Sequence, residues 1–73
     1  MPIRGLSYRS VASKLRKAGF EEVSQRGSHV KFAKYELEGT LTATVPKHDN
    51  IALGTMKSIL RQAGLSEEEF DRL

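Results

Sequence analysis

The chain has 73 residues, 38% apolar and 29% charged, with a net charge of +3 and no cysteine. This length and composition favour one small soluble domain, residues 1–73, and exclude disulfides and thiolate metal sites. No apolar run approaches the roughly 20 residues of a membrane helix, and the N-terminus lacks the apolar stretch of a signal peptide, so we expect a cytoplasmic protein.

The charge is unevenly distributed. Residues 1–65 contain eleven Lys and Arg against five Asp and Glu, whereas residues 66–73 are acidic. A basic body favours a polyanionic partner, because Lys and Arg neutralise phosphates and release their counterions. A basic surface that serves only solubility explains the same balance equally well.

The segment "LSYRSVASKLRKAGF" predicts the first helix, with Ser7 as its N-cap and Gly19 as its end. Its apolar residues recur at helical spacing along one side, at Tyr8, Val11, Ala12, Leu15 and Ala18. This helix therefore has a single apolar stripe to bury.

Three strands are predicted next, in "FEEVSQ", "HVKFAKY" and "TLTATV". In the second, Val30 and Phe32 share one face, while the other face holds His29, Lys31, Ala33 and Tyr35. The third alternates Leu41, Ala43 and Val45 with three threonines. The connections "RGS" and "ELEG" are so short that the strands should form an antiparallel meander.

Two more helices follow Pro46 and a polar loop. "GTMKSILRQAG" repeats the apolar stripe, with Thr55 or Gly54 as the expected cap and Gly64 as the stop. "SEEEFDRL" has a capping box, Ser66 with Glu69, that predicts a short C-terminal helix.

The expected fold is α+β, in the order α-β-β-β-α with a short helix at the end. Both longer helices should cover the one apolar face of the sheet, because no other large apolar surface is available to their stripes. The opposite face, with His29, Lys31, Thr42 and Thr44, should stay open.

His29 is the leading candidate for chemistry, since a neutral imidazole titrates near pH 6.5 and can accept or donate a proton at cellular pH. Gly27 allows a tight turn beside it, and the Ser28 hydroxyl could orient the ring. His48 could be a second proton-transfer group or bind phosphate. From the residues alone, an exposed histidine without a role remains the more common outcome for either side chain.

The best phosphate-binding set comprises Lys31, Lys47, Lys57 and Arg61. A solvated basic face is an equally good explanation of that set. Two histidines without a third ligand do not make a convincing zinc site, so no metal is expected.

Three segments, "AGFEEVSQRGSHVKF", "TVPKH" and "LGTMKSILRQAGLSEEEF", resemble the HicA family of bacterial and archaeal toxins in order and spacing. The resemblance implies a fold similar to double-stranded-RNA-binding domains, and places the catalytic histidine at His29. His48 and the Gly54 to Gly64 helix also match family positions. The chain departs from the family at Met56, where Leu is usual, and at "KYELEGT", which replaces a His-Pro-Asp-Gly type of turn.

The resemblance also implies metal-independent cleavage of mRNA, growth arrest, and neutralisation by a HicB-type antitoxin, with no cofactor. We expect His29 to be the catalytic proton-transfer group. The expected RNA-binding residues are Gly27, Ser28, Lys31, Lys47, His48, Lys57 and Arg61. Two alternatives remain, namely a non-catalytic RNA-binding module and an interaction protein that uses the open sheet face only for docking.

Overall fold

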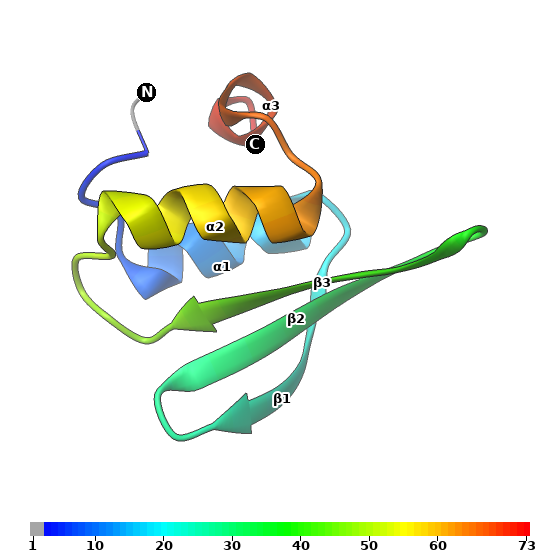
Figure 1. Cartoon of the computed structure of the whole chain (residues 1–73), viewed down its shortest axis with the longest axis horizontal. Helices are drawn as coiled ribbons and strands as arrows, with labels where there is room; N and C mark the ends of the chain where they lie inside the picture. Colours follow the sequence, from blue (N-terminus) through cyan, green and yellow to red (C-terminus); the bar gives the residue numbers. More distant parts are fainter. Residues whose placement is uncertain (1–2) are drawn as a thin grey trace.

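A computed structural model describes residues 3–73; Met1 and Pro2, the first residues of the expected domain, lie outside the described range. The order of elements is α1 (Tyr8–Lys17), β1 (Glu21–Arg26), β2 (His29–Glu36), β3 (Gly39–Pro46), α2 (Leu53–Ala63) and α3 (Glu67–Asp71). This is the predicted α+β order. Figure 1 shows α1 and α2 on one side of the sheet, with α3 above them.

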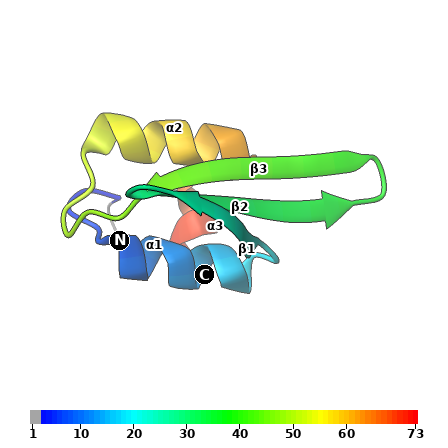
Figure 2. The ribbon, with the colours of Figure 1, turned by 90° about the horizontal axis from the view of Figure 1, so that it is seen from below.

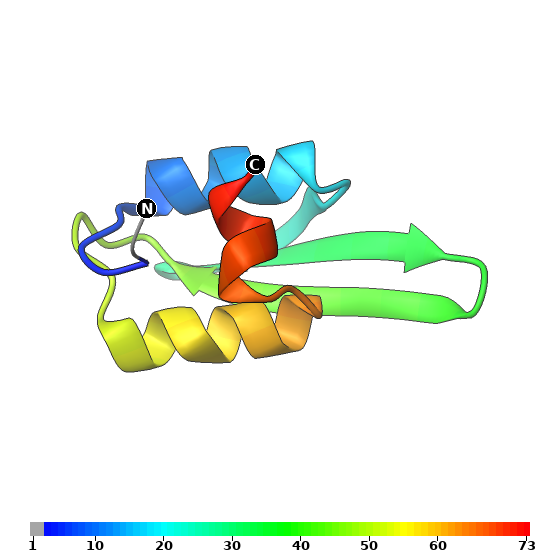
Figure 3. The same ribbon diagram turned by 90° about the horizontal axis from the view of Figure 1, so that it is seen from above.

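The three strands form an antiparallel sheet in the order β1-β2-β3, so β2 lies in the middle. Glu22 pairs with Phe32 and Ser24 pairs with Lys31, which leaves Val23 as an extra residue in a β-bulge. The bulge explains the imperfect alternation of this segment, because an extra residue shifts the side chains that follow it. The β2–β3 hairpin extends beyond the helices at its far end (Figures 2 and 3).

The helices meet the sheet as their apolar stripes predict. Val11 and Leu15 of α1 are fully buried with Met56 and Ile59 of α2, and all four belong to the same core as Phe32. The predicted N-cap is confirmed, since the Ser10 N–H donates to Ser7 Oγ at 3.2 Å.

The short helix α3 closes the core from the side opposite the sheet (Figure 3). Its Phe70 is fully buried, and Lys14 of α1 donates to the Phe70 carbonyl at 3.2 Å, with its ammonium 5.0 Å from the ring centroid. The predicted capping box is present. The Glu69 N–H donates to Ser66 Oγ at 3.0 Å, and the Ser66 N–H donates to Glu69 Oε1 at 2.8 Å.

The expected start of α2 was wrong. The helix begins at Leu53, and its N-cap is Ala52, which makes no side-chain capping bond, instead of Gly54 or Thr55. The preceding backbone is fixed by tertiary contacts, because Ile51 is 1% exposed and its N–H donates to the Leu6 carbonyl at 2.8 Å. The chain enters the helix directly from this anchored position, without a side-chain cap.

One residue of the outer sheet face differs from expectation. Ala33 is 2% exposed, although strand alternation places it on the face away from the helices. It lies in the middle strand between Glu21 and Thr42. Because a methyl group is shorter than the side chains around it, those neighbours cover it.

The outer edge of β3 is partly closed by α2. The Thr44 N–H points out of the sheet and donates to Gln62 Oε1 at 3.0 Å, and Gln62 Nε2 donates to Ser58 Oγ at 3.1 Å. Two residues later Pro46, the last residue of β3, has no N–H to offer. The end of β3 near the helices is thus sealed against further strand pairing.

Candidate functional site

His29 is the first residue of β2 and follows a two-residue turn, Gly27–Ser28. Gly27 has φ +59°, and glycine is the residue that adopts positive φ at the first central position of such hairpin turns. The turn is held on both sides. Gln25 Nε2 donates to the Gly27 carbonyl at 3.0 Å, and the Lys47 N–H donates to the Ser28 carbonyl at 2.6 Å. These bonds fix the backbone that positions His29.

The imidazole lies on the open face of the sheet, as predicted. A depression of about 390 Å³ there is lined by Ser24, Arg26, His29, Lys31 and Thr44, which we call the His29 face. Strand register explains this set, because Arg26 faces His29 across the β1–β2 hairpin, while Ser24 and Thr44 flank Lys31 on either side. All five side chains are exposed.

The His29 face is positively charged. Arg26 and Lys31 contribute two cations, and no carboxylate is among the lining residues. Within residues 3–73, neither cation forms an ion pair, so both are available to an anion. An imidazole beside two free cations can exchange a proton with a ligand whose negative charge the cations neutralise.

Arg26 and Ser24 were not predicted from the sequence. The signal for Arg26 was nevertheless present in "RGSH", because a two-residue turn makes the residues on either side of it face each other. Ser24 could not be placed in the same way, since the bulge at Val23 changes the register of β1.

The other expected binding residues lie elsewhere. Lys47 and His48 border a larger cleft of about 620 Å³, between α1 and the loop after β3, which we call the α1 cleft. Lys57 and Arg61 are exposed on α2 and line a depression with Ser66 and Glu67, at the start of α3. The structure therefore brings Lys31 to His29, and places the other cations in two separate regions of the helical side.

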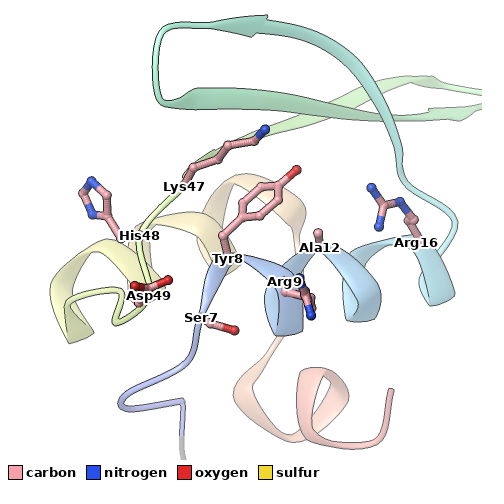
Figure 4. A pocket seen from close by; sticks show the side chains of 8 residues that line it. All are labelled: Ser7, Tyr8, Arg9, Ala12, Arg16, Lys47, His48 and Asp49. Carbon is pink, nitrogen blue, oxygen red and sulfur yellow. The ribbon is translucent and has the colours of Figure 1, made fainter.

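His48 does not share the His29 face. In Figure 4 its ring points away from Lys47 and Tyr8, and its backbone has a structural role. The His48 carbonyl accepts the Tyr8 N–H at 2.9 Å, which ties the loop to the first turn of α1.

Within residues 3–73 no group of three or more His, Asp or Glu side chains is arranged to hold a metal ion. In the same range, no helix is long and apolar enough to cross a membrane.

Comparison with known families gives one result. A family model described as "HicA toxin of bacterial toxin-antitoxin" matches residues 8–65, which is well over half of the chain and includes every residue of the His29 face. No curated protein matches the chain.

Proposed function

The chain belongs to the HicA toxin family of bacterial toxin–antitoxin systems, and we propose that it is a metal-independent endoribonuclease that cleaves mRNA. The observation that supports this activity best is the His29 face, where one imidazole and two cations without carboxylate partners share an open surface. A phosphodiester needs this combination, because its cleavage moves protons and accumulates negative charge on phosphorus.

In the proposed reaction the RNA supplies its own nucleophile. The 2′-OH attacks the adjacent phosphorus while His29 accepts its proton, the O2′–P bond forms, and the bond from phosphorus to the 5′-oxygen of the next nucleotide breaks. Arg26 and Lys31 stabilise the charge on the phosphorane oxygens. One imidazole cannot accept and donate a proton in the same step. Since His48 does not line this face, water or the Lys31 ammonium donates the proton to the leaving oxygen.

The toxin family implies an antitoxin partner. We propose a protein of the HicB type that covers the His29 face, because a partner seated there would block the imidazole directly. In a cytoplasm without that partner, the active toxin would cleave mRNA and arrest growth. Copurification of the untagged neighbouring gene product with the wild type would test the pairing.

The test of catalysis compares wild type with His29→Ala on total RNA in EDTA. The histidine is exposed, and within residues 3–73 it has no hydrogen bond or ion pair through its side chain, so the variant should fold normally. We expect cleavage to fall by about 10²–10⁴-fold, the range of general acid–base catalysis. Lys17→Ala removes an exposed residue of α1 outside the His29 face and is the matched control.

Two results would contradict the proposal. If His29→Ala cleaves RNA as fast as Lys17→Ala, the catalytic assignment is wrong. If the wild type binds RNA with a steep salt dependence and never cleaves it, the chain is a non-catalytic RNA-binding module.

A further inference from the structure

The α1 cleft is larger than the depression of the His29 face, and the proposed chemistry does not use it. Its walls come from one side of α1, from its first turn to its last, and from the loop that follows β3. Figure 4 shows Lys47 and Tyr8 extending toward the β1–β2 hairpin, with Arg16 farther along α1 on the same side. One cavity is therefore lined by two cations and an aromatic ring from two separate segments, together with Arg9, His48 and the carboxylate of Asp49.

Contacts with neighbouring side chains hold these residues in place. The Lys47 ammonium lies 5.5 Å from the centroid of the Tyr8 ring, and the Arg16 guanidinium carbon lies 5.8 Å from the centroid of the Phe32 ring. Glu22 of β1 accepts a hydrogen bond from the Tyr8 hydroxyl at 3.3 Å and lies 3.7 Å from Arg16. The Arg16 and Glu22 side chains are 55% and 42% exposed, so this ion pair is weak and a ligand can compete for the guanidinium.

Tyr8 lines this cavity with its ring, and its hydroxyl donates a hydrogen bond to Glu22. Burial, followed by the charge of Glu22 and its hydrogen bond, raises the pKa of the Tyr8 hydroxyl. The hydroxyl therefore keeps its proton at neutral pH. The two cations suit a phosphate group, and the Tyr8 ring adds a flat apolar surface beside them.

The α1 cleft and the His29 face are neighbours around the end of the sheet. Lys47 donates its backbone N–H to Ser28, the residue directly before His29. Its side chain lies over Tyr8, on the helical side, whereas His29 lies on the opposite face with Thr44. Two pairs of cations thus lie on either side of the Gly27–Ser28 turn, Lys31 and Arg26 on the open sheet face and Lys47 and Arg16 on the helical side.

We propose that the α1 cleft is a second phosphate-binding subsite for the RNA substrate, and that the substrate segment is single-stranded. This inference rests on the proposed function and extends it to the substrate class. A single strand can bend around the turn and place one phosphate on each side of the sheet. A double helix is too wide and too stiff to follow that corner. Cationic grooves with aromatic side chains are typical of proteins that bind single strands.

The experiment measures RNA binding in the His29→Ala background, where cleavage does not interfere. The probes are a 20-nucleotide uridine oligomer and a 20-base-pair RNA duplex. Lys47→Ser and Arg16→Ser should each weaken binding of the oligomer about fivefold, the upper end for an exposed ion pair. Each should also reduce the slope of log affinity against log salt by about 0.7, the contribution of one phosphate contact in a single strand.

Two further variants make the test specific. Lys17→Ser removes the same charge from α1 outside the cleft, and should leave binding and the salt slope unchanged. Glu22→Gln should act in the opposite direction and tighten binding several-fold, because it removes the carboxylate that competes for Arg16. Circular dichroism of each variant checks that it is folded.

The outcomes separate this inference from the proposed function. If the protein with His29 intact cleaves RNA, but Lys47→Ser and Arg16→Ser bind like Lys17→Ser, the second subsite is wrong and the ribonuclease stands. If the duplex binds more tightly than the oligomer, the assignment to single strands is wrong. If the chain with His29 intact neither binds nor cleaves RNA, both proposals fail together.

Discussion

Replacing Phe70 with alanine should strongly destabilise the fold, although Phe70 lies in a helix of only five residues. Its side chain is fully buried, and it is the buried residue that α3 contributes to the core. Truncating a buried Phe to Ala costs about 3–5 kcal/mol. A folded chain of 73 residues has a total stability of only about 4–11 kcal/mol. The variant should therefore lose about a quarter of its stability or more.

Urea denaturation followed by circular dichroism measures this loss, and the melting temperature should fall by at least about 12 °C. The control is Glu67→Ala, an exposed position on the same helix, which should change stability by no more than about 0.5 kcal/mol. A loss below 1 kcal/mol for Phe70→Ala would show that α3 is dispensable, and would refute the view that it completes the core.

Three further outcomes can be measured with the same methods. Gly27→Ala and Gly39→Ala both force alanine into positive φ (59° and 142°), and each should lower the free energy of unfolding in urea by about 1–2 kcal/mol. Only Gly27→Ala should also slow RNA cleavage, because Gly27 lies in the turn before His29. Equal effects of the two variants on cleavage would argue against a role for this turn. Hydrogen bonds from the Ser66 N–H and hydroxyl lower the pKa of Glu69 below its ordinary 4.5. The folded state then binds fewer protons than the unfolded state near this pH. Wild type should therefore be more stable than Glu69→Gln above pH 4.5, and should lose that advantage as the pH falls through the lowered pKa. A stability advantage that persists at pH 2 would contradict this linkage. Gly54→Ala should stabilise α2 by up to about 1 kcal/mol, because an added Cβ meets open space in a helix, and a lower urea midpoint would contradict it.

Sequence periodicity predicts the layers of this fold because each element has only one way to bury its apolar side. The stripe of Val11 and Leu15 and the alternation of Val30 and Phe32 can be satisfied together only if the helices cover that face of the sheet. The same alternation places His29 and Lys31 on the opposite face. Local patterns were therefore sufficient for the architecture and for the position of the catalytic candidate.

The composition of the site was harder to predict, because it depends on tertiary geometry. Lys31, Lys47 and Lys57 are indistinguishable as exposed cations in a sequence, yet they lie on the open sheet face, in the α1 cleft and on the outer side of α2. The start of α2 was missed for a similar reason. Contacts of Ile51, instead of a capping side chain, determine where that helix begins.

The hydrogen bond from Thr44 to Gln62 affects how much of the β3 edge is open to pairing with another chain at high protein concentration. An exposed strand edge is a template on which another chain can add a strand and start aggregation. Here Gln62 occupies one outward N–H of β3, and Pro46 removes the next one along. The outward N–H groups that remain in β3, at Thr40 and Thr42, offer only a short stretch at the far end of the hairpin. A glutamine without any part in the proposed chemistry thus shortens the edge on which another chain could add a strand.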